Sequence, residues 1–226
     1  MATRTKPKTK PKQLLAVDTV SRRPQQGRSK ASLERMLSAA EKLMAEGGNE
    51  DFTLQDVSRT GDVSIGSIYL RFESKDNLVR AVIAGYNARI AEDQNSMISA
   101  VTNQSRDLAA FMGNFVDAYA EFLREHAPML RLAMDRARHD PLVSGPGKET
   151  ATRAAQVSAD AMLAFSNEFG GEDRELKAFS AFNVIFSTLA RQLSLGSSAE
   201  TSQDLDWLVL KKQLARMCLA YLKHTD

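Results

Sequence analysis

Cysteine, histidine and tryptophan are scarce in this sequence of 226 residues, which contains one Cys, three His and one Trp. The single Cys218 cannot form a disulfide within the chain. The histidines are too scattered to build a metal site with it. No Gly-rich phosphate loop follows a strand, and no nucleophile stands in a recognised catalytic motif. We therefore expect a protein that is not an enzyme and that uses no cofactor and no metal.

Long hydrophobic runs are also missing. The sequence has no apolar run long enough to span a membrane, and its first residues lack the hydrophobic region of a signal peptide. We therefore expect no membrane span and place the protein in the cytoplasm. Only six prolines occur, and no strand-like alternation of polar and apolar residues recurs. This pattern predicts an all-α fold.

Charge is unevenly distributed along the chain, although the net charge is only +2. The first 30 residues carry nine Lys or Arg and one acidic residue, a net charge of +8. The remaining residues carry 21 basic and 27 acidic residues, a net charge of −6. The basic N-terminus favours contact with a polyanion. Residues 1–27 have little apolar surface, so we expect a disordered basic tail, either an arm that binds DNA or a solubilising leader.

The stretch 52–75 contains two short capped helices in succession. Thr53 is a good N-cap with Asp56 three residues later, and Ser64 can cap a second helix. Residues 60–62, Thr-Gly-Asp, lie between them and can turn the chain without a long loop. Two helices of under three turns that are joined this tightly are typical of a helix-turn-helix.

This stretch resembles the DNA-binding segment of the TetR family of bacterial transcriptional regulators. The positions that fit the family's pattern are Val57, Val63, Ser64, Gly66, Ser67, Ile68, Tyr69, Phe72, Ser74, Lys75 and Leu78. Ser58 and Gly61 stand where the family prefers Ala, and Asp62 stands where it prefers Gly. Asp is one of the few residues that tolerate a left-handed backbone, so we expect the turn to survive.

Two residues of this stretch are unfavourable for helix stability and indicate a nearby polyanion. Gly66, in the first turn of its helix, costs about 0.8–1 kcal/mol relative to Ala, as expected if a duplex must come close. Lys75 lies in the first turn of the next helix, where its positive charge is unfavourable beside the positive end of the helix dipole. A bound phosphate would offset this unfavourable interaction. The resemblance implies DNA contacts by Thr53, Ser64, Ser67, Tyr69 and Lys75 with phosphates or the groove, and by Ile65, Leu70 and Arg71 near base edges. Gly66 itself and Arg28, at the end of the basic tail, complete this predicted site.

Helical spacing of apolar residues continues to the C-terminus. We expect nine helices: one at about 29–46, one that starts at Thr53, one at 64–72, one that starts at Lys75, and five more at about 105–125, 128–137, 148–169, 172–195 and 202–223. The helix that starts at Lys75 has a possible end or bend at 95–96. Pro128 suits a first turn, and the Pro- and Gly-rich residues 139–147 predict a loop. The resemblance implies the same nine helices: three in a DNA-binding domain at 28–74 and six in a regulatory domain at 75–226.

The regulatory part is rich in Phe and Met at helical spacing, a pattern shared by ordinary cores and by apolar ligand cavities. By the resemblance, a small-molecule effector binds between the fourth, fifth, seventh and eighth helices. The candidate ligand-binding residues are Tyr86, Arg89, Phe111, Phe115, Tyr119, Phe122, His126, Met162, Phe165, Phe182, Asn183 and Phe186. Arg89 has an alternative role, because it could pair with Asp93 instead. A fatty, aromatic or drug-like effector would suit these side chains.

The last two predicted helices are apolar on more than one face, and a monomer could not readily bury all of this apolar surface. Two such helices from each partner would form a four-helix interface, and a symmetric dimer would offer two recognition helices to two half-sites. We therefore predict a ligand-responsive homodimeric repressor that binds a pseudo-palindromic DNA operator and is released by a small apolar effector. The alternative is a protein-interaction adaptor of the same fold with weak, sequence-neutral DNA binding.

Overall fold

The computed structural model describes residues 27–196 and 206–225, and these residues form helices and short connections without a strand. The helices are α1 (Gly27–Gly47), α2 (Leu54–Thr60), α3 (Ile65–Tyr69), α4 (Lys75–Gln104), α5 (Leu108–Ala137), α6 (Pro141–Leu163), the 3-10 helix η1 (Ser166–Glu168), α7 (Arg174–Gln192) and α8 (Trp207–Lys223). The predicted all-α fold is confirmed. Apart from Gly27, the predicted basic tail at 1–27 lies outside the described residues. In the described part of the chain, no helix is both long and apolar enough to cross a membrane.

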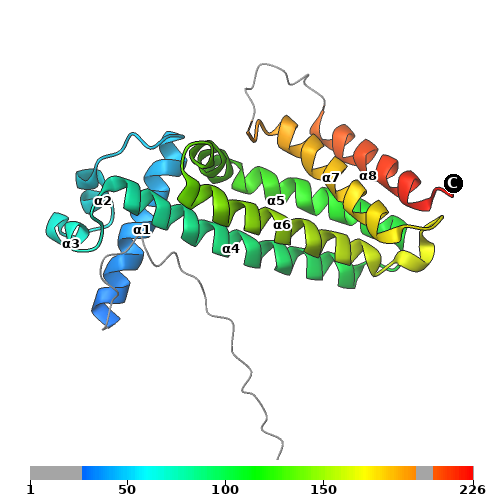
Figure 1. The fold of residues 1–226 in the computed structure, drawn as a ribbon, viewed down its shortest axis with the longest axis horizontal. Coiled ribbons are helices and arrows are strands. Elements are labelled where there is room, and N and C mark those ends of the chain that lie inside the picture. Colours follow the sequence, from blue (N-terminus) through cyan, green and yellow to red (C-terminus); the bar gives the residue numbers. More distant parts are fainter. Residues whose placement is uncertain (1–26, 197–205, 226) are drawn as a thin grey trace, which may run out of the picture.

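The helices form an elongated molecule with α2 and α3 at one end (Figure 1). α4, α5 and α6 pack against one another along the long axis. α7 packs on α6, α8 packs on α5, and the two lie side by side away from α3. α4 connects the two ends, because it begins shortly after α3 and packs on α1 as well as on α5 and α6.

The helix-turn-helix rests on α1 through fully buried apolar side chains. Met36 and Met44 of α1 are buried together with Val57, Ile68 and Phe72. These residues belong to the same apolar core as the longer helices. The three-to-four spacing of the apolar residues in α1 gives that helix one apolar face, and α1 packs against α2, which in turn packs against α3.

α5 is longer than predicted because Pro128 lies inside it. The predicted break between one helix ending at 125 and another beginning at Pro128 is therefore wrong. A proline inside a helix costs about 3 kcal/mol, since it removes one hydrogen bond and crowds the preceding turn. Ala127 and Met129 are buried on either side of the exposed Pro128. Burial of this continuous apolar face offsets the local cost.

The predicted loop at 139–147 is wrong beyond residue 140, because α6 begins at Pro141 and continues through Gly145, Pro146 and Gly147. Pro141 is well tolerated in the first turn, where its missing N–H has no helical partner to lose. The other three residues are poor helix formers, and their intrinsic preference led to the prediction of a loop.

Two contacts hold the start of α6 in a helical conformation. The Asp140 Oδ1 atom accepts a hydrogen bond from the Leu142 amide at 3.1 Å and so caps the helix. Val143 is buried in the core. Tertiary packing and a cap therefore override local propensity in this segment.

The remaining differences concern helix ends. α4 is a single helix of 30 residues that passes through 95–96 without a break. The predicted helix at 148–169 ends at Leu163 and is followed by η1. The last helix begins at Trp207, and residues 202–205 of the prediction lie outside the described residues. The nine predicted helices become eight α-helices in this part of the chain, because the fifth and sixth form one.

Candidate DNA-binding interface

α3 lies at one end of the molecule (Figure 1), and one side of it is exposed. Ile65 is 36% exposed, Tyr69 62% and Leu70 60%, whereas Ile68 on the other side of the helix is fully buried. Large apolar side chains gathered on one exposed face mark interaction sites. This surface is therefore a candidate interface.

Gly66 lies in the first turn of α3 and has no neighbour that requires a glycine. A Cβ atom built at this position would meet no atom within 4 Å. Glycine nevertheless destabilises a helix by about 0.8–1 kcal/mol relative to Ala. A partner that must approach the backbone of α3 closely would explain this choice.

The two short helices are capped as predicted. Thr53 and Asp56 form a capping box, in which the Asp56 amide donates to Thr53 Oγ1 at 3.1 Å and the Thr53 amide donates to Asp56 Oδ2 at 2.8 Å. The Thr53 hydroxyl also donates to Asp56 Oδ2 at 2.6 Å, and the hydrogen bonds from this hydroxyl and from the Thr53 amide hold the pKa of the Asp56 carboxyl below its usual value. Ser64 Oγ accepts from the Ser67 amide at 3.1 Å and lies 2.7 Å from the Ser67 hydroxyl. Both cap residues, Thr53 and Ser64, remain exposed.

The turn between α2 and α3 is built by the three residues that depart from the family's pattern. Asp62 adopts a left-handed backbone with φ of 47°, as predicted. The Ser58 hydroxyl donates to the Val63 carbonyl at 2.6 Å and closes the turn. A Cβ at Gly61 would lie 3.0 Å from the Arg35 carbonyl oxygen of α1. The three departures therefore fit this turn and its close packing on α1.

Arg71 and Lys75 hold the helix-turn-helix together. The Arg71 Nη2 atom donates to the Ser29 carbonyl at 2.8 Å and to the Ser29 hydroxyl at 2.6 Å. The Lys75 Nζ atom donates to the Glu50 carbonyl and lies 4.7 Å from the centre of the Phe52 ring. Arg71 thus joins the end of α3 to α1, and Lys75 joins the start of α4 to the segment before α2. Sequence reasoning placed both side chains on DNA and missed these partners.

The predicted DNA contacts fall into three structural groups. Ile65, Gly66, Tyr69 and Leu70 form the exposed surface of α3, Thr53, Ser64 and Ser67 form the helix caps, and Arg71 and Lys75 are braces. The tenth predicted residue, Arg28, lies in α1, but its side chain is outside the described part of the structure.

Arg136, near the C-terminal end of α5, binds three carboxylates from three segments of the chain. Its Nη1 atom donates to Glu50 at 2.9 Å, its Nη2 atom to Asp76 at 2.7 Å, and its Nε atom to Asp140 at 2.9 Å. The Arg80 Nε atom donates to the same Asp140 oxygen at 2.7 Å. We refer to these five residues as the Arg136 cluster.

The Arg136 cluster connects the helix-turn-helix to the long helices. Glu50 lies before α2 and Asp76 in the first turn of α4, whereas Asp140 precedes α6. Asp140 is only 4% exposed. Burial opposes its ionisation, but the hydrogen bonds from Arg80 and Arg136 outweigh burial and hold its pKa below the usual value. No sequence pattern predicted this cluster, because it joins three segments that lie far apart in the chain.

Most of the predicted ligand-binding residues pack into one aromatic cluster. The ring centroids of Phe111 and Phe115 are 5.5 Å apart, and those of Phe115 and Tyr119 are 5.4 Å apart. Phe165 and Phe182 extend the cluster toward η1 and α7. Tyr119 and the first two phenylalanines are buried, and burial raises the pKa of the Tyr119 hydroxyl. Phe186 stacks beyond Phe182, Phe122 stacks on Tyr119, and Met162 is fully buried in the same core.

Tyr86 and His126 lie at the edge of the aromatic cluster, between α4 and α5. The Tyr86 hydroxyl donates to the His126 carbonyl at 3.1 Å, and the two rings meet edge to face at 5.8 Å. The His126 ring also contacts Phe122, with centroids 4.6 Å apart. Tyr86 and His126 therefore bring polar groups to this edge.

Arg89 and Asn183 do not join the aromatic cluster. Arg89 pairs with Glu41 of α1 and not with Asp93, so it joins α4 to α1. Asn183 is exposed on α7. Helical spacing placed these residues near the core, but each side chain lies on the outer side of its helix.

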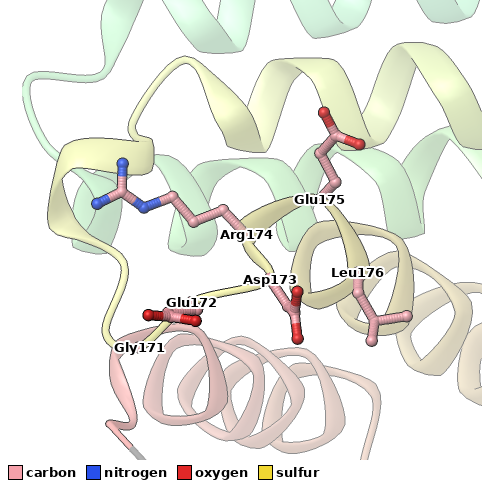
Figure 2. A pocket seen from close by; sticks show the side chains of 6 residues that line it. All are labelled: Gly171, Glu172, Asp173, Arg174, Glu175 and Leu176. Carbon is pink, nitrogen blue, oxygen red and sulfur yellow. The ribbon is translucent and has the colours of Figure 1, made fainter.

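Two surface hollows are lined by other residues. One, of about 590 Å³, lies at the start of α7, where Arg174, Glu175 and Leu176 point in different directions (Figure 2). The other, of about 410 Å³, lies between α5 and α8 and includes Gly113 and Lys212. The side chains of the first hollow do not converge, and neither hollow is lined by the predicted ligand-binding residues.

α7 and α8 carry large exposed apolar side chains. These are Leu176 and Val184 on α7, and Leu208, Val209, Met217 and Tyr221 on α8. Within the described residues, no group of three or more His, Cys, Asp or Glu side chains is placed to hold a metal ion.

Comparison with known proteins identifies both the N-terminal segment and the fold. Residues 36–82 match the model of a family described as bacterial regulatory proteins, tetR family. No match is found among curated proteins.

Three solved structures illustrate the likeness of the fold. A Mesorhizobium loti protein assigned to the tetR family has a TM-score of 0.65 and 16% identity, over 88% of this chain and 96% of that one. A transcriptional regulator from Cytophaga hutchinsonii has a TM-score of 0.63 and 17% identity, over 86% and 100%. FadR, a fatty acid degradation regulator from Bacillus halodurans, has a TM-score of 0.60 and 15% identity, over 89% and 100%. At these identities the likeness shows a common fold.

Proposed function

We propose that this chain, which carries the N-terminal domain of the tetR family of bacterial regulatory proteins at residues 36–82, is a transcriptional repressor that responds to a small molecule. The family match and the shared fold are those of a DNA-binding regulator. Residues 28–74 would form the DNA-binding unit and residues 75–226 the regulatory unit. The family match ends inside α4, which supports a role for this helix in both units. A protein that binds bacterial DNA would act in the cytoplasm.

The observation that carries the DNA-binding part is the exposed surface of α3. Ile65, Tyr69 and Leu70 are exposed on it, and a Cβ added at Gly66 would meet no atom within 4 Å. In a major groove, the apolar side chains would contact base edges such as thymine methyl groups, and Gly66 would let the backbone approach. The exposed cap residues Thr53 and Ser64 would contact phosphates.

The exposed apolar side chains of α7 and α8 support a homodimer. A monomer would leave Val184, Val209 and Met217 in water. Two helices from each partner would bury these residues in a four-helix interface. The twofold axis would then direct two copies of α3 to two half-sites of a pseudo-palindromic operator.

The aromatic cluster supports an apolar effector. Phe111, Phe115, Tyr119 and Phe182 form its centre, and Tyr86 and His126 offer polar groups at its edge. The likeness in fold to a fatty acid degradation regulator agrees with an apolar ligand. An effector that separates these rings would favour a second arrangement of the regulatory helices, and by linkage it would weaken operator binding.

Selection of bound fragments from a random duplex library tests the proposal. The purified protein should enrich one sequence with two related half-sites, and an apolar effector should release it. Recovery of fragments with no shared sequence at physiological salt would overturn specific DNA binding and would support the adaptor.

A further inference from the structure

The first two turns of α6, residues 141–147, form a helix in spite of their sequence. Gly145, Pro146 and Gly147 all lie inside the helix. Glycine lowers helix stability through backbone entropy, and an internal proline removes a hydrogen bond. The segment therefore depends on the Asp140 cap and on the buried Val143 more than on its own propensity.

Asp140 has two tasks, one for each carboxylate oxygen. Its Oδ1 atom caps α6 by accepting from the Leu142 amide at 3.1 Å. Its Oδ2 atom accepts from Arg80 at 2.7 Å and from Arg136 at 2.9 Å. Unwinding of residues 141–147 would remove the cap and free the backbone at Asp140, so the carboxylate would lose the position from which it holds both arginines.

Arg136 carries this connection to the DNA-binding unit. Its other two nitrogens bind Glu50, before α2, and Asp76, in the first turn of α4. Lys75 binds the Glu50 carbonyl and closes a second link between the same two segments. Arg136, which is itself held by Asp140, therefore joins the segment before α2 and the start of α4 to the end of α5.

We propose that residues 141–147 are a metastable segment whose unwinding releases the Arg136 cluster, and that Asp140 is the positioning residue that links the two events. When the segment is helical, Arg136 binds Glu50 and Asp76 and so holds the DNA-binding unit against the end of α5. When the segment unwinds, the residues before α2 and the first turn of α4 both lose this contact with α5. Only the last step, weaker DNA binding in the unwound state, rests on the proposed function.

Hydrogen exchange of a variant with a stronger α6 tests the linkage. A Cβ at Gly145 or Gly147 would meet no atom within 4 Å, so Gly145→Ala with Gly147→Ala should stabilise the helix without a new contact. Exchange should slow about fivefold per substitution, which corresponds to about 1 kcal/mol each. If the events are linked, peptides covering 48–53 and 75–80 should slow by a similar factor to those covering 141–147.

Gly113→Ala is the matched control, because Gly113 also lies in a helix and a Cβ there would meet no atom within 4 Å. It should slow exchange in α5 and leave 48–53 and 75–80 unchanged. Slower exchange at 141–147 with unchanged exchange at 48–53 and 75–80 in the double variant would overturn the proposal.

Asp140→Asn tests the link itself, since the amide oxygen can still cap α6 but the negative charge is lost. Exchange at 48–53 and 75–80 should become faster, and Gly145→Ala with Gly147→Ala should no longer slow it in this background. Persistent slowing would mean that the connection does not run through Asp140.

A measurement of DNA binding distinguishes a failure of this inference from a failure of the proposed function. Asp140→Asn should weaken binding to the fragment recovered from the random library by about tenfold. Unchanged affinity together with faster exchange at 48–53 would overturn the link to DNA binding. If no fragment is recovered, the proposed repressor fails, whereas the exchange experiments still decide whether α6 and the DNA-binding unit are linked.

Discussion

The two glycines of the helix-turn-helix differ in whether the structure leaves room for a methyl group in place of the Cα hydrogen. Gly61 faces α1 so closely that an added Cβ would lie 3.0 Å from the Arg35 carbonyl oxygen and 3.1 Å from the Val57 carbonyl oxygen. Gly66 faces open space. The first glycine is explained by packing within the protein, and the second requires an explanation outside it.

Gly61→Ala should therefore destabilise the protein by about 1–3 kcal/mol, because backbone atoms of α1 and α2 must move to admit the methyl group. Urea unfolding followed by circular dichroism measures the change. An unfolding free energy equal to that of the unmodified protein would show that α1 can shift without cost.

Gly66→Ala should have the opposite effect on stability, with a gain of up to about 1 kcal/mol from helix propensity. It should weaken binding to the selected DNA fragment by about tenfold, or roughly 1.4 kcal/mol, because the methyl group occupies the space that the duplex needs. Fluorescence anisotropy measures this affinity. A stabilised variant that binds DNA as tightly as the unmodified protein would contradict the role of α3.

Among the elements, α5 and α6 depend most on their neighbours. Each contains a proline beyond its first turn, and each remains helical. α5 has long buried stretches on either side of Pro128, whereas the start of α6 has one buried side chain, Val143, and the Asp140 cap. Asp140 is also an anchor for two arginines, so its charge supports the helix junction as well as the cap.

The contribution of Asp140 should depend on pH with a defined sign. Its pKa is lowered in the folded protein, so its charge adds stability above the unfolded pKa of about 4, and this stability is lost as the pH falls through the lower folded pKa. Asp140→Asn should cost about 3 kcal/mol at pH 7. The difference between the two proteins in urea unfolding should shrink below about pH 4, and a difference that is constant from pH 7 to pH 3 would contradict this assignment.

At the scale of the whole molecule, the two exposed surfaces lie apart along the long axis, which supports DNA binding in one part and dimer formation in the other. α3 is exposed at one end, and the apolar surface of α7 and α8 lies away from it (Figure 1). α4 and the Arg136 cluster lie between these surfaces and connect the two parts. A dimer formed through α7 and α8 would leave both copies of α3 exposed.

Val184→Glu should dissociate this dimer, because the new charge would have to be buried in an apolar interface. We expect the dimer to weaken about a hundredfold, which corresponds to roughly 3 kcal/mol. Light scattering at micromolar concentration measures the mass. Leu142→Glu is the control, since Leu142 is equally apolar and exposed but lies on α6. Dissociation by both substitutions, or a monomeric unmodified protein, would contradict the interface.

Sequence alone determined the features that depend on residues three to five positions apart. The caps at Thr53 and Ser64 and the left-handed turn at Asp62 are of this kind. The alternation of Ile65 and Ile68 between exposed and buried sides of α3 also follows from helical spacing. These interactions are local, so neighbouring residues specify them before any distant segment is in place.

Only the tertiary structure decided the features that depend on distant segments. Pro128 and Pro146 lie in helices because packing and capping outweigh their local preference. Arg71 binds Ser29, and Arg136 binds Glu50, across 42 and 86 positions of sequence. Many such partners are compatible with one sequence, and the folded chain selects among them because it brings only some of these groups within hydrogen-bond distance.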